Sequence, residues 1–519
     1  MTRDVVVIGS GHNALIAACY LAREGLDVEV VERDTVLGGA VSTVQRWPGY
    51  AVDRGSSAHI MVRHTGIVED LHLDECGLRY LDMDPWGFAP FGDARAGEQQ
   101  AITFHVDLDR TCVSIAGVCG ERDADAYRAF VVDWGARNAA VFDAFQDLPT
   151  AGRLGRHLWR TGAATGVGGL EMSRQFLQPG DQLLDEHFAD ERLKTALAWL
   201  GAQSGPPTHE VATADLVGWN ALLHTLPPGR AVGGSGALSW ALAERLRRLG
   251  GTVRLGDGAA AVTSNGDRVT GITTTSGERI AARTVVAGCH VLTTLELLGD
   301  EGLLRRATTA VRVGNGIGMV VRLGTSALPV YPGAATGSPY SALQLLAESR
   351  TQLRRAHGDF VSGRTPNEPA VVVMTFSALD PSIAPPGRHN VTAWAQWHPY
   401  QLTTGEHWDD IGEREADRIV AQVEKSAPGF TDTIEHRHVQ TPLDLERELG
   451  LRRGNVMHVE MGLDSMFAYR PLPELAGYRT PVRGLFLTGA STHPGGGVFG
   501  ASGRTAARVV LASRRRRWR

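Results

Sequence analysis

Near the N-terminus, Gly9, Gly11 and Ala14 follow a short run of β-branched residues, and Glu32 lies about twenty residues beyond the glycines. This spacing suits the binding of a dinucleotide. Gly9 permits a tight turn, Gly11 lets the backbone approach a pyrophosphate, and Ala14 lets a helix pack closely on a strand. The free N–H groups of the helix would face the phosphates. Glu32 is placed to accept hydrogen bonds from a ribose.

A strand, a helix and a second strand must hold these residues in position, and the sequence supplies them in that order. Residues 5–8 predict a buried parallel strand, and residues 15–24 have helical spacing that ends at Gly25. Residues 28–31 predict a second buried strand. An ordinary structural turn would explain the glycines alone, but it would not explain an acid in register. The sequence therefore predicts a Rossmann-like nucleotide-binding domain.

Three further segments rich in glycine and small residues are candidates to approach the same ligand. They are the glycine pair 38–39, residues 52–59, and residues 491–498, which follow a predicted buried strand over 484–490. Ordinary loops explain the first two segments equally well. The third leads into a helix whose N-terminus would stabilise negative charge on a reduced ring. A plain C-terminal strand–helix unit would leave its three consecutive glycines unexplained.

The composition is that of an ordinary soluble globular protein. The chain has 519 residues, of which 43% are hydrophobic and 21% charged, and a net charge of -5 gives no general attraction to nucleic acid. Five scattered cysteines without a Cys-x-x-Cys pair predict neither a disulfide scaffold nor a metal site. The sequence enters a strand almost at once, with no room for a signal peptide, and no apolar run is long enough to span a bilayer. We expect a cytoplasmic protein.

Three segments differ in character from the nucleotide-binding pattern. Residues 123–145 predict an amphipathic helix. Residues 150–170 are rich in glycine and carry three arginines around Trp159, which predicts a solvated loop with one packed indole. The alternative is a membrane-surface patch, so peripheral membrane contact stays open. The arginine-rich residues 513–519 predict a solvated, disordered end.

From about residue 228, the sequence again shows the pattern expected of the nucleotide-binding domain. Residues 237–249 predict a helix, and residues 259–282 predict antiparallel strands around an Asn-Gly turn. Residues 284–288 predict another buried strand. We interpret this region as a helix and a β-meander inserted into the nucleotide-binding domain.

The region from about 300 to 475 has a different pattern, with long predicted strands followed by one helix. The strands are predicted over 317–323, 370–376 and 391–398, and the helix over 408–424. Aromatic and imidazole side chains gather over residues 394–408. They would line an apolar cavity or pack in the core, and the sequence alone does not separate the two.

With both ends considered, the chain resembles a phytoene-desaturase-type flavoprotein of the amine-oxidase-like superfamily that binds FAD. The motifs are Val-Ile-Gly-x-Gly-His-Asn-Ala-Leu (7–15), Glu-Arg-x-x-x-x-Gly-Gly (32–39) and the segment 484–498. The resemblance extends to residues 454–458 and to Arg470-Pro471, and it points to the pyridine-nucleotide-disulfide-oxidoreductase-domain branch. Little of the substrate-facing part of the chain can be matched.

The resemblance implies an α/β fold with two interleaved domains. A Rossmann-like FAD-binding domain would be assembled from residues 1–85, 228–300 and 476–519. An α+β substrate-binding domain would be formed by residues 86–227 and 301–475.

The resemblance also implies contacts with each part of FAD. The diphosphate would contact Gly9, Ser10, Gly11, His12 and Asn13, the adenosine ribose would contact Glu32 and Arg33, and the adenine would contact Ala259. The ribityl chain and the flavin would contact Gly38, Gly39 and Ala40. Gly489 and Ala490 would contact the diphosphate and the ribityl chain, and Gly497 and Val498 would contact the pyrimidine edge of the flavin.

The implied activity is removal of two hydrogens from a lipophilic or secondary-metabolite-like small molecule. The reaction would be C–C desaturation or C–N or C–O oxidation, with hydride passing to flavin N5 and oxygen or a quinone reoxidising the flavin. His493 and His59 are candidates for proton transfer, and Arg470 for anchoring a polar end of the substrate. Packing for the histidines and a salt bridge for the arginine are the structural alternatives. The functional alternatives are an FAD-dependent isomerase without net oxidation and a non-catalytic flavin-binding chaperone or scaffold.

Overall fold

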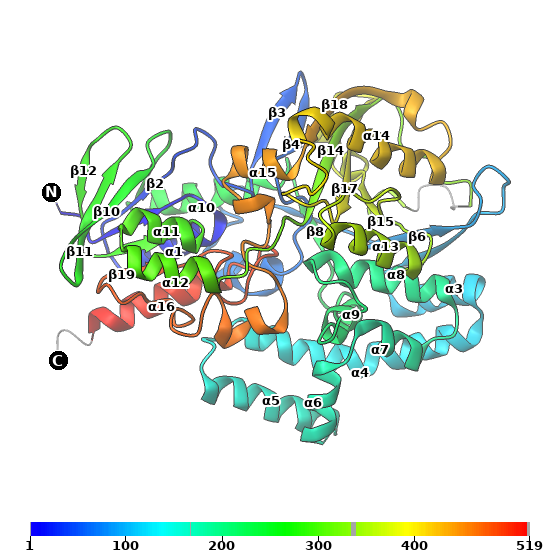
Figure 1. Cartoon of the computed structure of the whole chain (residues 1–519), viewed down its shortest axis with the longest axis horizontal. Helices are drawn as coiled ribbons and strands as arrows, with labels where there is room; N and C mark the ends of the chain where they lie inside the picture. The colour runs from blue at the N-terminus through cyan, green and yellow to red at the C-terminus, as the bar shows by residue number, and fades with distance from the viewer. Residues whose placement is uncertain (1, 167, 334–338, 516–519) are drawn as a thin grey trace.

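A five-stranded parallel sheet organises one end of the protein (Figure 1). The computed structural model describes residues 2–166, 168–333 and 339–515. The sheet has the order β19-β13-β1-β2-β9, so strands from distant parts of the chain lie side by side. Its strands are β1 (Val5–Ile8), β2 (Val28–Val31), β9 (Thr252–Arg254), β13 (Val285–Ala287) and β19 (Leu485–Leu487).

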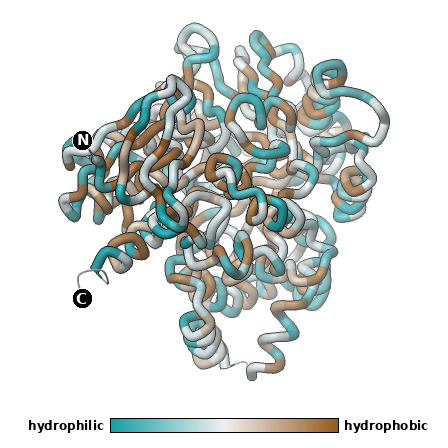
Figure 2. The backbone as a smooth tube through the Cα atoms, turned by 60° about the vertical axis from the view of Figure 1, so that its left-hand side comes forward, coloured by the Kyte–Doolittle hydropathy of each residue, from teal (hydrophilic) through white to brown (hydrophobic). Residues whose placement is uncertain are grey.

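Both faces of this sheet are covered, which explains why β1, β13 and β19 consist of apolar residues. Val5 and Val7 pack against a helical layer, whereas Val6 and Ile8 pack against an antiparallel three-stranded sheet and the helix that follows it. The helical layer contains α1 (His12–Arg23), α10 (Gly236–Arg248) and α16 (Ala501–Arg515), and the other face is covered by β10 (Ala259–Asn265), β11 (Arg268–Thr274), β12 (Arg279–Ala281) and α11 (Val291–Leu298), followed by α12 (Glu301–Ala310). Figure 2 shows hydrophobic stretches running through this region and hydrophilic turns outside it.

A mixed seven-stranded sheet forms the second part of the protein, with the order β18-β14-β17-β16-β15-β6-β7. Its neighbouring strands are antiparallel, apart from the parallel pair β15 and β6. The strands are β6 (Gly87–Phe91), β7 (Gln100–Phe104), β14 (Gly318–Thr325), β15 (Leu343–Leu346), β16 (Val371–Met374), β17 (His389–Gln396) and β18 (Ile434–Gln440).

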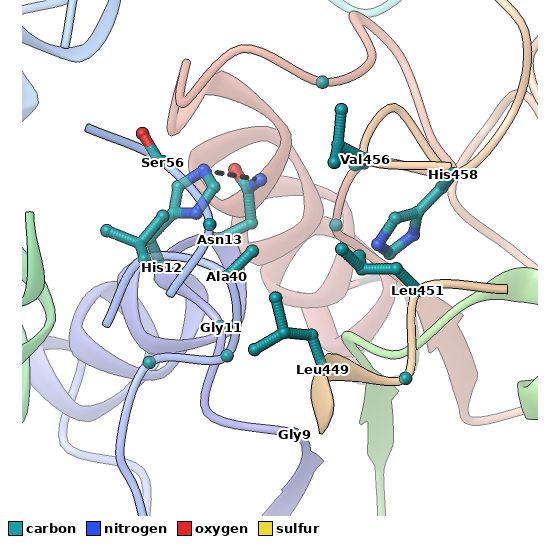
Figure 3. A pocket seen from close by; sticks show the side chains of 18 of the residues that line it. Gly9, Gly11, His12, Asn13, Ala40, Ser56, Leu449, Leu451, Val456 and His458 are labelled. Carbon is teal, nitrogen blue, oxygen red and sulfur yellow. Dashed lines mark hydrogen bonds between the residues drawn. The ribbon is translucent and has the colours of Figure 1, made fainter. Parts of the chain in front are cut away.

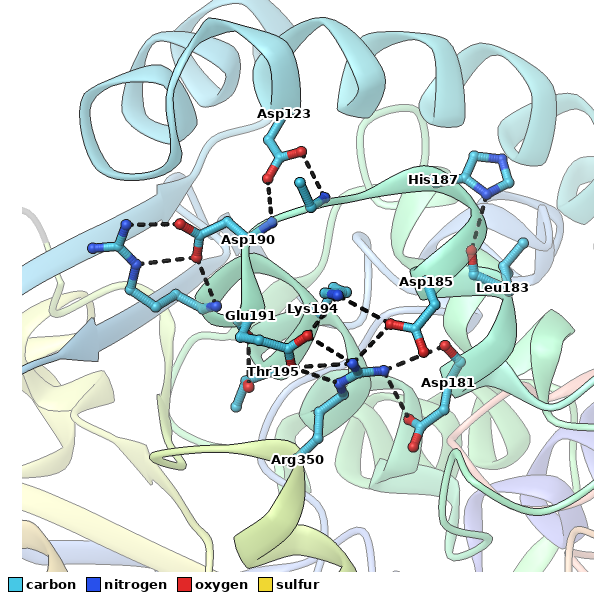
Figure 4. Close-up of polar contacts among 12 residues, drawn as sticks. Asp123, Asp181, Leu183, Asp185, His187, Asp190, Glu191, Lys194, Thr195 and Arg350 are labelled. Atoms are coloured by element: carbon cyan, nitrogen blue, oxygen red, sulfur yellow. Dashed lines mark hydrogen bonds and ion pairs between the residues drawn. The ribbon is translucent and has the colours of Figure 1, made fainter.

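Helices cover both faces of the mixed sheet. One face packs against α14 (Trp408–Ser426). The other packs against α3 (Leu108–Cys119), α4 (Glu121–Phe145), α7 (Gly180–His187), α8 (Glu191–Gly201), α9 (Ala214–Leu222) and α13 (Arg350–Val361). The α7, α8 and α13 helices are joined by Arg350, which donates to Asp185 and Glu191 (Figure 4).

Smaller elements connect the two large sheets. Two antiparallel pairs are formed by β3 (Thr43–Trp47) with β4 (Tyr50–Asp53), and by β5 (Tyr80–Asp82) with β8 (Gly229–Ala231). The remaining α-helices are α2 (Ile67–Asp70), α5 (Ala151–Thr165), α6 (Gly169–Leu177) and α15 (Pro442–Leu449). In the described part of the chain, no helix has both the length and the hydrophobicity to cross a membrane.

The structure confirms the predicted strands and helices of the nucleotide-binding part, and it confirms the long strands of the second sheet to within a few residues. The division into two domains stays a prediction, although the strands of each sheet come from the segments assigned to the corresponding domain.

The predicted loop over residues 150–170 is wrong, because residues 151–165 form α5. Asp147 lies just before the helix and accepts hydrogen bonds from Arg156 and His157, and it also pairs with Arg153. A carboxylate at a helix N-terminus is stabilising and offsets part of the cost of the glycines. Trp159 is not packed, since 73% of its surface is exposed. Its exposure suits the membrane-surface alternative, which stays a prediction.

The predicted disordered end is wrong for residues 513–515, which continue α16. Arg514 pairs with Asp4 at 3.1 Å, and this ion pair ties the helix to the start of the chain. Residues 516–519 lie outside the described residues.

The close contact between α1 and α16 provides a test of the fold. A Cβ atom at Gly503 would lie 2.2 Å from the carbonyl oxygen of Asn13, so Gly503→Ala must push the helices apart. We expect the free energy of unfolding to fall by about 1–3 kcal/mol, measured by urea denaturation. Gly117→Ala in α3 is the matched control, because none of the described residues has an atom within 4 Å of a Cβ atom there. A Gly503→Ala variant as stable as the wild type would contradict this packing.

Candidate functional site

One cavity of about 590 Å³ lies where the two sheets meet, and segments from both ends of the chain line it. Figure 3 shows Gly9, Gly11, His12 and Asn13 around it, with Leu449, Leu451, Val456 and His458 facing them. The predicted FAD-contacting residues that line the cavity are Gly9, Gly11, His12, Asn13, Glu32, Arg33, Gly38, Gly39, Ala40, Ala259, Gly489, Ala490, Gly497 and Val498. The structure therefore brings the N-terminal and C-terminal glycine segments to one site.

Backbone geometry explains why glycine is needed at two of these positions. Gly9 has a φ of 90° at the turn after β1, a conformation that other residues rarely adopt. Gly489 has a φ of 94°, and a Cβ atom there would lie 2.8 Å from the carbonyl oxygen of Gly288. Gly11 differs, because its φ is ordinary and a Cβ atom would meet no atom of the described residues within 4 Å. Its missing side chain leaves space in the cavity itself.

The N-terminus of α1 opens into this space. Gly11 is the N-cap residue, no side chain among the described residues caps the helix, and no acidic residue occupies its first turn. The unpaired N–H groups and the helix dipole favour a bound anion. Asn13 accepts a hydrogen bond from the backbone N–H of Gly503 at 3.3 Å, which fixes the start of α16 beside the same site. This arrangement fits the diphosphate of a dinucleotide.

Ser10 lies next to the site and connects Glu32 with Gly38 through hydrogen bonds. The carboxylate of Glu32 accepts hydrogen bonds from the backbone N–H of Ser10 at 2.7 Å and from its hydroxyl at 2.9 Å. The Ser10 hydroxyl also accepts from the backbone N–H of Gly38 at 3.0 Å. Ser10 lies outside the set of residues that line the cavity, so the predicted direct contact with the diphosphate stays a prediction. The carboxylate of Glu32 lines the cavity and keeps lone pairs that can accept from a ribose.

Three histidines line the cavity, and burial keeps each of them neutral near pH 7. Burial lowers the pKa of His12 and that of His290 to about 4, and it lowers the pKa of His458 well below its usual value. The rings of His290 and His458 lie 5.3 Å apart. Sequence reasoning missed His290 as a site residue, and it used His458 only as part of the 454–458 motif.

The mixed sheet contributes the opposite wall of the cavity. Val320 and Arg322 of β14, Met374 of β16, and Thr392 and Trp394 of β17 line it. Gly55 to Ala58 also line it, which confirms that the 52–59 segment approaches the same site. Of the aromatic residues over 394–408, Trp394 lines the cavity, whereas Trp397 and Trp408 pack in the core. Sequence reasoning missed Arg322, because one arginine within an apolar strand does not reveal which way it faces.

The predicted proton carriers His59 and His493 lie outside the residues that line the cavity. The ring nitrogens of His59 are 2.8 Å from the hydroxyls of Tyr80 and Ser235. His493 lies within hydrogen-bond distance of the carbonyl oxygen of Ala144, and its ring packs beside Phe145 and Phe467. These contacts favour the packing alternative, and the catalytic role of either histidine stays a prediction.

Arg470 also lies outside the residues that line the cavity, and its side chain is fully buried. Its guanidinium donates to five backbone carbonyls, which belong to Met457, Val459, Glu460, Ser465 and Ala490. The arginine therefore holds the 457–465 segment against the end of β19. The contacts favour a structural role, although the partners are carbonyls rather than the acid of a salt bridge.

Comparisons with known proteins agree with this architecture. Residues 7–71 match the model of the NAD(P)-binding Rossmann-like domain. The mouse pyridine nucleotide-disulfide oxidoreductase domain-containing protein 2 is 31% identical over 98% of this chain and 93% of its own length. The chain belongs to the family of pyridine nucleotide-disulfide oxidoreductase domain-containing proteins. The phytoene dehydrogenase of Streptomyces griseus is 27% identical over 98% of this chain and 95% of its own length.

Similarity to solved structures extends over the whole chain. The cyclohexylamine oxidase of Brevibacterium oxydans has a TM-score of 0.58 and 15% identity, with all of both chains covered. These findings confirm the predicted resemblance to phytoene-desaturase-type and amine-oxidase-like proteins and the predicted Rossmann-like α/β fold. The chain is an oxidoreductase.

The buried histidines make stability depend on pH. An unfolded histidine binds a proton near pH 6.5, whereas His290 stays neutral in the folded state down to about pH 4. Between these values the unfolded state binds more protons, so the free energy of unfolding falls as the pH is lowered. His290→Asn removes this group and keeps an acceptor at the N-cap of α11. We expect the pH slope between 6.5 and 4 to become shallower by about 1.4 kcal/mol per pH unit.

The measurement is urea denaturation at a series of pH values. His72→Asn is the matched control, because His72 is exposed and is not among the residues that line the cavity. An unchanged slope in His290→Asn would show that His290 is not held neutral by burial.

Proposed function

We propose that the protein is an FAD-dependent oxidoreductase that removes two hydrogens from a lipophilic or secondary-metabolite-like small molecule. The observation that carries the proposal is the single cavity shared by the α1 N-terminus, the C-terminal glycine segment and the mixed sheet. The first turn alone would suit any dinucleotide. The continuous lining from Ala259 and Glu32 to Val498 supports a longer ligand whose ring reaches the substrate wall.

In this proposal, each part of the chain has a defined task toward FAD. The α1 N-terminus holds the diphosphate, Glu32 accepts from the ribose, and the segment around Gly497 and Val498 approaches the ring. Bound FAD supplies a two-electron acceptor. Because His290 and His458 are neutral, they add no positive charge to the part of the cavity that they line. The apolar side chains of the mixed-sheet wall exclude water.

The substrate loses two hydrogens as a C–C, C–N or C–O single bond becomes a double bond. The final acceptor of the two electrons would be oxygen, reduced to hydrogen peroxide, or a quinone, reduced to a quinol. Val320, Met374 and Trp394 form an apolar wall that favours a lipophilic substrate body. The name of the bacterial phytoene dehydrogenase supports desaturation, and the name of the cyclohexylamine oxidase supports oxidation of an amine.

Gly11→Ala tests the proposed cofactor site directly. A methyl group at Gly11 meets no atom within 4 Å in the part of the chain that the structure describes, so we expect the apoprotein to unfold at the wild-type temperature. The methyl group would occupy the space assigned to the diphosphate, so FAD affinity should fall at least about tenfold, which corresponds to about 1.4 kcal/mol. The measurement is flavin released on denaturation together with calorimetric titration of the apoprotein with FAD. Wild-type protein that neither releases nor binds flavin would contradict the proposal.

Anaerobic mixing with candidate substrates tests the reaction. Oxidation predicts bleaching of the flavin absorbance together with a two-hydrogen loss of substrate mass. Product of unchanged mass would instead indicate the isomerase alternative. Flavin that neither substrates nor reductants can cycle would indicate a flavin-binding chaperone or scaffold.

A further inference from the structure

Arg322 is a buried cation on the substrate side of the cavity. It lies on β14, opposite Thr392 of β17 and His438 of β18, and only 1% of its surface is exposed. Its side chain lines the cavity beside Val320 and Trp394. Burial lowers the pKa of Arg322 to about 10, so its guanidinium still carries a charge near pH 7.

The partners of this guanidinium are all neutral, and most are distant. Nη1 donates to the hydroxyl of Thr392 at 3.0 Å and to that of Ser57 at 3.4 Å. Nε donates to the side-chain oxygen of Gln440 at 3.4 Å, and Nη2 donates to the carbonyl oxygen of Gly55 at 3.4 Å. Three of the four contacts are longer than the usual N–H···O range. Arg322 forms no ion pair with any residue that the structure describes.

Arg230, Arg350 and Arg470 are buried arginines that are satisfied differently. Arg230 pairs with Asp53, and Arg350 donates to the carboxylates of Asp185 and Glu191 (Figure 4). Arg470 donates to five carbonyls. An isolated buried charge is costly, and proteins normally pair it. Arg322 therefore has unused capacity to bind an anion.

The acids near Arg322 are already engaged by other groups. Asp53 pairs with Arg230 and also accepts from the hydroxyl of Thr43 at 2.7 Å and the backbone N–H of Ser235 at 2.9 Å. Glu448 accepts from Gln440 at 3.0 Å and pairs with Arg46 at 3.5 Å. With Asp53 offset by Arg230, Arg322 leaves a net positive charge in this part of the interior.

We propose that Arg322 binds a carboxylate of the substrate, which makes the substrate a lipophilic acid. This inference rests on the proposed function, because it assigns the mixed-sheet wall to the substrate. A guanidinium presents parallel N–H groups that match the two oxygens of a carboxylate. The apolar side chains of Val320, Met374 and Trp394 beside it would hold the hydrocarbon body. The charged end is therefore fixed at Arg322 and the reacting carbon is oriented along the apolar wall.

The test uses 4-phenylbutanoate and its neutral amide as a matched pair of probes. Each is titrated into the purified protein, and binding is followed by calorimetry and by quenching of tryptophan fluorescence, since Trp394 lines the cavity. We expect the wild-type protein to bind the carboxylate at least about tenfold more tightly than the amide. Arg322→Met should abolish this preference, and Arg322→Lys should keep part of it.

Arg504→Met is the matched control, because Arg504 is also a buried arginine but donates to Thr65 and Gln146 away from the cavity. We expect it to keep the preference for the carboxylate. Equal wild-type affinity for acid and amide would overturn the proposal, and this comparison needs no variant to fold. Survival of the preference in Arg322→Met would also overturn it, whether or not that variant retains bound flavin.

The two proposals fail in distinguishable ways. Absence of flavin from the wild-type protein would contradict the proposed function, whereas the carboxylate preference is measured without turnover. A preference that depends on Arg322 in flavin-free protein would support the anion site on its own.

Discussion

The N-terminus of α1 is a group of backbone donors that the protein does not satisfy by itself. Gly11 supplies no side chain to cap it, and the described residues place no acid in the first turn of the helix. Such a helix end is costly unless an anion or water meets it. The features around it keep the position open, since Gly9 turns the chain and Ser10 is bonded to Glu32 and away from the cavity.

The fold brings the two ends of the chain together around this helix end. The α16 helix can approach α1 closely because Gly503 has no side chain, and its backbone N–H reaches Asn13. On the far side, Arg470 draws the 457–465 segment toward the end of β19. The contacts of α16 with α1 and of Arg470 with the 457–465 segment therefore hold two sides of the cavity in place, and the mixed sheet supplies the remaining wall.

The predictable part of the site is the part encoded locally. Strand, turn, helix and acid follow each other within the first 32 residues, so their geometry can be derived from spacing alone. The mixed-sheet wall depends on which face of β14 meets the cavity, and only the packed structure reveals that Arg322 faces inward. Likewise, His59 and His493 lie within three residues of cavity residues in the sequence, but their side chains contact other partners. The glycines of α5 are typical of a loop, whereas contacts at its N-terminus favour a helix.

We propose that one bound molecule contacts both the turn at the N-terminus of α1 and the 496–498 segment near the C-terminus. A crystal structure of the protein grown with FAD measures this directly. We expect a single FAD with its diphosphate at the N-terminus of α1 and its ring between the 496–498 segment and the mixed sheet. FAD bound elsewhere, or contacts to the N-terminal turn without contacts to Gly497 and Val498, would contradict the account.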